Sequence, residues 1–206
     1  DSEDRDVFTR LFLDYARTRP GDYMKGLAEK AAQFLSSREL PRNDDLYVAR
    51  RYSMLLSALA WKAGRFGFPF GLLLPLALVG LVRYRKRIPA PLWIFLVAYP
   101  AAVVAVFVTG RYRIPLVPVL AIPAAAGALA LVDLARARRW AAAAAVTATV
   151  CAAAALMSAA GPYAVERYNY EAEMHRVVGF ELMKQRRADA ALAELSESLR
   201  LDPENG

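Results

Sequence analysis

Four long apolar segments constrain this chain more than any other feature of its sequence. They lie near residues 66–82, 92–108, 116–134 and 141–160. A helix needs about 17–25 apolar residues to cross a bilayer, and a helix satisfies its own backbone polar groups within lipid. The sequence therefore predicts an all-α, integral membrane protein with about four spans in residues 65–161.

The fourth segment depends most on its neighbours. Residues 141–160 are mostly alanine, so this helix has few large apolar side chains to hold it in lipid. Close packing of its small residues against other helices would stabilise it there. If this segment did not cross the membrane, the carboxy-terminal tail would lie in the cytoplasm, and the first three spans would remain as assigned.

The positive charges of the chain are grouped beside its apolar segments. The formal net charge is +7, while 57% of the residues are apolar and 23% are charged. The surplus lies in two clusters, Arg83, Arg85, Lys86 and Arg87, and Arg136, Arg138 and Arg139. Such clusters are typical of the cytoplasmic side of membrane proteins and not of a surface that binds a nucleic-acid duplex. We therefore expect an inner or plasma membrane location, contact with membrane lipid and no nucleic-acid partner.

With both basic clusters in the cytoplasm, four spans place both ends of the chain on the extracytoplasmic side. Residues 1–64 would then form an extracytoplasmic or interfacial helical segment. An amphipathic helix is expected within it, with one apolar face made by Tyr23, Leu27, Ala31, Phe34 and Leu35. A further helix is expected near Leu46–Ala63. No signal-peptide pattern follows Asp1, so we expect a piece cut from a longer protein.

After the last apolar segment, residues 172–205 carry a 34-residue pattern of two antiparallel helices. This segment resembles a tetratricopeptide repeat. Gly179, Ala191 and the closing "LRLDPEN" match that family, whereas His175, Leu182 and Ser198 depart from it. The resemblance implies a protein partner that binds through the repeat. One repeat cannot bury its own apolar face, so we expect more copies beyond Gly206.

Motifs of soluble enzymes are not found in the sequence. It contains no "HExxH" motif, no Cys/His metal spacing and no glycine-rich phosphate loop. His175 is the only histidine, so a Ser-His-Asp set would have to be built on it, and Cys151 is the only cysteine, so no intrachain disulfide can form. We therefore expect no protein-bound metal site.

The segment Thr109–Pro115 places two arginines, Arg111 and Arg113, in the short connection between two apolar segments. An arginine at a membrane edge reaches the interface, a water-filled cavity or a counter-charge. The pair could therefore act as interfacial anchors that extend to lipid headgroups, or as a clamp that binds a phosphate bidentately. Arg111 follows the flexible Gly110, so the phosphate-clamp interpretation is favoured more strongly for Arg111 than for Arg113.

The order of several short motifs along the chain is similar to that of a known protein family. The chain contains, in this order, "ELPRNDDLY", an apolar span, a basic loop and "FVTGRYRIPLVPVLAIPAAAGA". In this order of motifs, nearly the whole chain resembles the carboxy-terminal part of bacterial GT-C-type membrane glycosyltransferases. The resemblance is to the dolichyl-phosphate-mannose-protein mannosyltransferase-like group. The resemblance implies a sugar donor linked to polyprenyl phosphate, whose phosphate is held by basic residues on the outer face, here Arg111 and Arg113. It also implies a catalytic carboxylate in an earlier outer loop, upstream of Asp1.

Polar residues before the first span would face the same side as this arginine pair. Glu39 and Asn43 are candidates to contact the acceptor or a divalent cation. For Asn43, as for Asp44 and Asp45, a solvated loop that caps the next helix is the alternative reading.

The sequence is also compatible with two other functions. An O-antigen ligase or polymerase would also combine many spans with outer-face arginines, which would bind a lipid diphosphate. A non-catalytic membrane scaffold would use the carboxy-terminal repeat to recruit a protein. The scaffold would explain the tail but not the two arginines.

Overall fold

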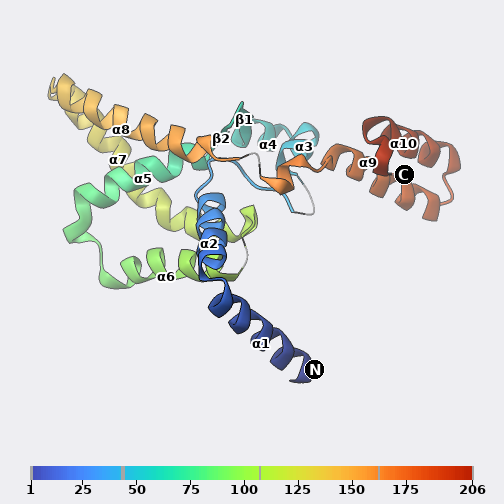
Figure 1. The fold of residues 1–206 in the computed structure, drawn as a ribbon. Coiled ribbons are helices and arrows are strands. Elements are labelled where there is room, and N and C mark those ends of the chain that lie inside the picture. Colours follow the sequence, from blue (N-terminus) through green and yellow to red (C-terminus); the bar gives the residue numbers. More distant parts are fainter. Residues whose placement is uncertain (1, 43–44, 107, 162, 206) are drawn as a thin grey trace.

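The computed structural model describes residues 2–42, 45–106, 108–161 and 163–205 (Figure 1). About 80% of the chain is helical, which confirms the prediction of a mostly helical protein. The helices before the first apolar segment are α1 (Ser2–Thr18) and α2 (Pro20–Phe34). Helix α1 projects away from the body of the molecule, while α2 packs against α6 (Figure 1).

The expectation of one helix over Leu46–Ala63 is wrong. This stretch instead forms α3 (Leu46–Ala49), η1 (Arg50–Tyr52), α4 (Met54–Leu59) and strand β1 (Trp61–Ala63). Ser53 has an extended backbone and its hydroxyl accepts a bond from the Leu56 amide, so it ends one helical piece and caps the next. The break follows from this capping residue, which apolar periodicity does not reveal.

Strand β1 pairs with β2 (Phe66–Phe68) in an antiparallel hairpin that an all-α prediction did not include. Gly64 takes a positive φ of 56° in the turn, a conformation that glycine adopts without strain. The ring of Trp61 stacks on that of Phe68 at 5.2 Å. Because β2 occupies residues 66–68, the first apolar helix begins later than expected, at Phe70.

The apolar region contains four longer helices. These are α5 (Phe70–Tyr84), α6 (Ala90–Val106), α7 (Leu116–Arg136) and α8 (Trp140–Ala159). Within the described residues, α7 and α8 are long and apolar enough to cross a membrane, with mean hydropathies of 2.0 and 1.8, and α6 is a shorter apolar helix. The structure therefore gives weak support for a membrane location.

Helices α5, α7 and α8 pack against one another, and the contact between α5 and α7 is the most extensive of the three. Gly80 and Gly127 lie at this crossing, where a Cβ added to Gly80 would stand 1.9 Å from the carbonyl oxygen of Pro123. The core beside the crossing comprises Phe34, Phe70, Leu74, Ala77, Leu116, Leu120 and Ala124. Backbone contact through small residues therefore sets the distance between α5 and α7.

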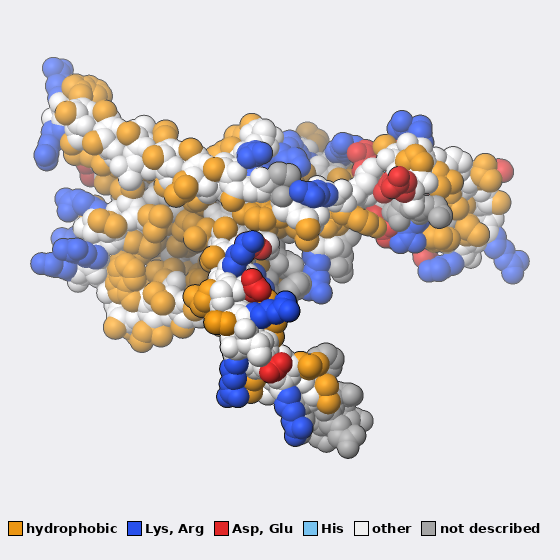
Figure 2. Space-filling view, in the orientation of Figure 1, with side chains coloured by type: hydrophobic (Ala, Val, Ile, Leu, Met, Phe, Trp, Pro, Cys, Tyr) orange, Lys and Arg blue, Asp and Glu red, His pale blue; other side chains and the backbone are white. Residues whose placement is uncertain are grey.

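The two basic clusters lie at the same end of these helices (Figure 2). One occupies η2 (Arg85–Arg87) and the end of α5, and the other occupies the turn from α7 to α8. The connection η3 (Gly110–Arg113) lies at the opposite end, beside α2 (Figure 1). The chain therefore has a basic end and a distinct end that carries the arginine pair.

A helical hairpin follows at the carboxy terminus. After η4 (Ala164–Arg167), it consists of α9 (Tyr170–Lys184) and α10 (Ala188–Leu201), and η5 (Pro203–Asn205) follows it. Gly179 permits close approach, because a Cβ there would lie 2.7 Å from Cγ of Leu195. The Ser198 hydroxyl donates to the Ala172 carbonyl at 2.8 Å. The predicted pair of antiparallel helices is present.

Candidate functional site

The loop between α2 and α3 is the centre of the site. Ser36, Ser37 and Arg38 are almost fully buried, although serine and arginine usually lie at a protein surface. The Ser37 amide donates to the Met157 carbonyl at 3.2 Å, and the hydroxyls of Ser37 and Ser158 lie 2.8 Å apart. The loop is thus fastened to the last turn of α8, far away in sequence.

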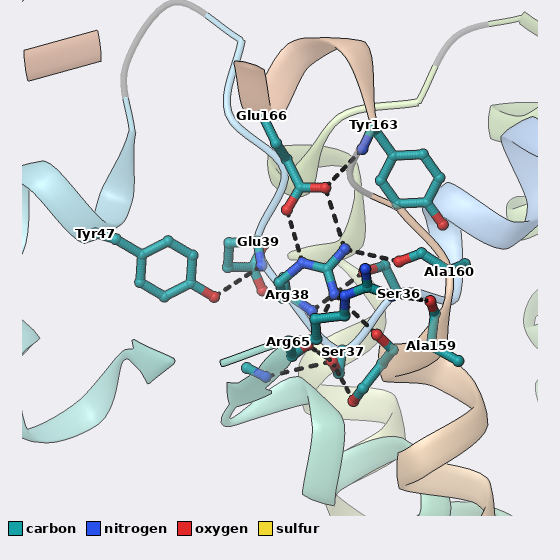
Figure 3. A network of polar contacts seen from close by, with 12 residues as sticks. Ser36, Ser37, Arg38, Glu39, Tyr47, Arg65, Ala159, Ala160, Tyr163 and Glu166 are labelled. Atoms are coloured by element: carbon teal, nitrogen blue, oxygen red, sulfur yellow. Dashed lines mark hydrogen bonds and ion pairs between the residues drawn. The ribbon is translucent and has the colours of Figure 1, made fainter. Parts of the chain in front are cut away.

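Arg38 is the larger anchor of this loop (Figure 3). Its Nε and Nη2 atoms donate to the two carboxylate oxygens of Glu166 at 2.7 and 3.1 Å. The remaining N–H groups donate to the carbonyls of Arg65, Ser158 and Ala160. Every N–H of the guanidinium therefore has an acceptor, as a buried cation requires.

Glu166 is held as a carboxylate by these contacts. Burial raises the pKa of this carboxyl, but the bonds from Arg38 and from the Tyr163 amide outweigh burial and leave the pKa below its usual value. The Tyr163 amide donates to Oε2 of Glu166 at 2.9 Å. This ion pair connects the α2–α3 loop with the segment that leads into the carboxy-terminal hairpin.

Arg113 lies inside the protein and is only 2% exposed. Its Nη1 donates to the Ser36 carbonyl at 2.5 Å, and its Nη2 donates to the Arg38 carbonyl at 2.6 Å and to Oε2 of Glu39 at 2.8 Å. The guanidinium also lies 4.3 Å from the ring centre of Phe70. In this arrangement both terminal nitrogens of Arg113 donate to the α2–α3 loop.

Arg111 is placed differently, because its side chain is exposed and lines a hollow of about 460 Å³. It forms no ion pair with an acidic residue in the described parts of the chain. The polar side chains that line the hollow are those of Glu39, Arg42, Thr109, Arg111 and Arg113. Its apolar side chains are those of Leu40, Pro41, Leu46, Leu59, Ala60, Pro69, Ile114 and Val117. The hollow thus combines cationic groups with an apolar wall.

Two small residues shape the polar part of this hollow. A Cβ on Gly110 would lie 2.6 Å from Oε2 of Glu39, so a larger residue here would displace that carboxylate. Thr109 is 5% exposed, and its hydroxyl has no hydrogen-bond partner among the described residues. A buried polar atom without a hydrogen-bond partner is rare in folded proteins.

The structure thus brings three of the four predicted site residues together. Glu39, Arg111 and Arg113 all line the hollow, and Glu39 pairs with Arg113. Asn43 lies outside the described residues. Asp45 caps α3, since its carboxylate accepts from the Tyr47 amide at 2.8 Å, as the alternative reading of that loop predicts.

Sequence reasoning missed Arg38 and Glu166, which are 128 residues apart and belong to no local motif. It also gave no role to Thr109, which stands directly before the Gly110 that it noticed. The sequence gives no signal for the Arg38–Glu166 pair, because the burial that makes Arg38 need partners is seen only in the structure.

In the part of the chain that the structure describes, no group of three or more His, Cys, Asp or Glu side chains could hold a metal ion. Comparisons with protein families, curated proteins and solved structures found no match for this chain. Its function is therefore inferred from the geometry of the hollow and the residues around it.

Proposed function

We propose that this chain is the carboxy-terminal portion of a membrane glycosyltransferase, which moves a sugar from a polyprenyl phosphate to an extracytoplasmic acceptor. The observation that carries the proposal is the hollow, in which the exposed Arg111 adjoins an apolar wall. A phosphate on a hydrocarbon chain has the same two-part character. The catalytic carboxylate would come from sequence before Asp1.

The residues of the hollow have separate roles in this proposal. Departure of the lipid phosphate builds negative charge, which the Arg111 guanidinium stabilises by bidentate hydrogen bonds. Arg113 holds Glu39 and the α2–α3 loop in position beside the phosphate of the donor.

The proposal includes four spans, α5 to α8, with the basic end in the cytoplasm. The grouping of the basic residues at one end supports this topology (Figure 2). Helix α5 has 15 residues, so it is about 22 Å long, shorter than a hydrocarbon core of about 30 Å. Its packing against α7 and α8, with local thinning of the bilayer, would accommodate the difference.

Cys151 provides a test of the span assigned to α8. It is exposed on the surface of this helix, so a membrane places it in lipid. We expect a water-soluble maleimide to leave Cys151 unmodified in intact membranes and to modify it after denaturation in detergent. A Cys151→Ala/Ser196→Cys variant, with its thiol on the exposed face of α10, serves as the reactive control. Equal labelling of Cys151 in intact membranes would exclude the α8 span.

Arg111→Gln tests the donor site in the full-length protein. We expect transfer to fall about 100-fold or more, as when one preorganised transition-state donor is removed. Arg167→Gln is the matched control, because Arg167 is an exposed arginine that does not line the hollow. Both turnover and binding of polyprenyl phosphate are measured. Normal turnover in Arg111→Gln would contradict the proposed role.

The same binding measurement separates the two enzyme alternatives. A glycosyltransferase of the proposed kind binds a polyprenyl monophosphate, whereas a ligase or polymerase would prefer the diphosphate. Preference for the diphosphate in the wild type, lost in Arg111→Gln, would favour the ligase.

We further propose that α9 and α10 form a tetratricopeptide repeat that contributes to protein binding. The hairpin leaves large apolar side chains exposed on its surface, among them Val178, Phe180, Met183, Leu192 and Leu199. Such a surface is typical of a unit that stacks on a further copy. This observation also favours the scaffold alternative for the tail, while the hollow favours an enzyme.

A further inference from the structure

The basic end of the molecule carries seven exposed cations with little opposing charge. They are Arg83, Arg85, Lys86, Arg87, Arg136, Arg138 and Arg139. None of them forms an ion pair with an acidic residue in the ranges that the structure describes. Asp133 is the only acidic residue within segments 82–90 and 133–140. This end of the protein therefore presents a concentrated positive field.

Part of this surface is shaped as a hollow. A depression of about 810 Å³ is lined by residues 82–87 in the connection from α5 to α6. The guanidinium carbons of Arg83 and Arg87 lie 5.5 and 5.9 Å from the ring centre of Tyr84. A ring within this distance of two guanidinium groups restrains them, so less side-chain entropy is lost when they bind an anion.

Exposed apolar side chains directly adjoin the charges. On α5 and α7 they are Leu78, Val82, Leu129 and Val132, and Trp140 opens α8 beside Arg139. A nucleic acid or a soluble phosphate would leave these side chains in water. An amphiphile would cover them with hydrocarbon while its headgroup reached the arginines, and tryptophan is common at that depth of a membrane.

We propose that the basic end is a binding site for anionic phospholipid. The headgroup phosphate binds in the depression of the α5–α6 connection, the arginines of the α7–α8 turn add to its attraction to this end, and the acyl chains lie along the apolar side chains of α5 and α7. This site is at the opposite end from the hollow around Arg111, so it does not depend on glycosyl transfer. It rests on the proposal that these helices lie in a membrane.

The test uses the full chain purified in detergent, with phosphatidylglycerol and phosphatidylcholine as probes. Retained lipid is counted by native mass spectrometry, and affinity is measured by displacement of a fluorescent phosphatidylglycerol. We expect the wild type to bind phosphatidylglycerol and not phosphatidylcholine. Two triple variants, Arg85→Gln/Lys86→Gln/Arg87→Gln and Arg136→Gln/Arg138→Gln/Arg139→Gln, should each bind it about tenfold or more weakly, since each basic residue adds to the attraction.

A matched control removes three positive charges elsewhere, in Lys184→Gln/Arg186→Gln/Arg187→Gln at the turn of the carboxy-terminal hairpin. This variant should bind like the wild type. A lysine variant that keeps the charge, Arg85→Lys/Arg87→Lys, should retain binding and show that lost binding does not reflect unfolding. Equal weakening in the control would overturn the proposal. So would equal displacement by glycerol phosphate, which lacks acyl chains, or by an oligonucleotide, which would indicate a nucleic-acid site.

Discussion

Replacing Gly80 with alanine is expected to destabilise the protein severely, by about 3 kcal/mol or more. The added methyl group would stand 1.9 Å from the Pro123 carbonyl oxygen and 2.7 Å from its carbon, distances that no side-chain rotation can relieve. Helices α5 and α7 would have to move apart, opening the core around Phe70 and Leu116. The expected result is a large fall in the thermal denaturation temperature, followed by the loss of helical circular dichroism in detergent.

Gly26 in α2 provides a matched control for this substitution. A Cβ added there would meet no atom within 4 Å, so Gly26→Ala introduces the same methyl group into a helix without a contact. We expect it to leave the denaturation temperature unchanged or slightly raised, since alanine favours helix more than glycine does. Gly127→Ala should resemble Gly80→Ala, because its Cβ would stand 2.2 Å from the Leu76 carbonyl oxygen. Equal stability of Gly80→Ala and Gly26→Ala would refute backbone contact at this crossing.

The sequence predicted the helices better than it predicted their contacts. Length and apolarity were enough to locate α6, α7 and α8 within a few residues, because each satisfies its own backbone hydrogen bonds. The close approach of Gly80 and Gly127 could not be predicted, because the two glycines are on different helices and neither belongs to a spaced motif. The β1–β2 hairpin was hidden because residues 66–68 continue the apolar run of α5.

The candidate site was predictable only in part. Two arginines beside an apolar segment indicated an anionic partner, and the structure shows that the partner of Arg113 is internal, the carboxylate of Glu39. Which arginine faces inward depends on η3, whose turn buries Arg113 and exposes Arg111. A sequence pattern gives the spacing of these residues, whereas burial is decided by the α2–α3 loop that packs over them.

Arg38→Met is expected to destabilise this loop by about 3–5 kcal/mol, because removal of one partner leaves a buried charge without compensation. Glu166 would lose both of its guanidinium bonds, and the carbonyls of Arg65, Ser158 and Ala160 would lose their donors. Arg65→Met, in contrast, removes one exposed bond to the Ala159 carbonyl and should cost much less. Both variants are compared with the wild type by protease sensitivity of the α2–α3 loop and by the denaturation temperature. Arg38→Met should change both measurements more than Arg65→Met does.

The acid sensitivity of the protein should depend on the same ion pair. Glu166 has a folded-state pKa below its ordinary value of 4.5, so the carboxylate contributes stability above that value. This contribution is lost as the pH falls through the lower folded-state pKa, when the carboxyl takes up a proton. Glu166→Gln removes the titrating group, so it should lower stability at pH 7 and flatten the decline below about pH 4.5. If both proteins lost stability with the same slope in that range, a different carboxylate would have to control acid unfolding, and the Arg38–Glu166 pair would not be the anchor of the loop.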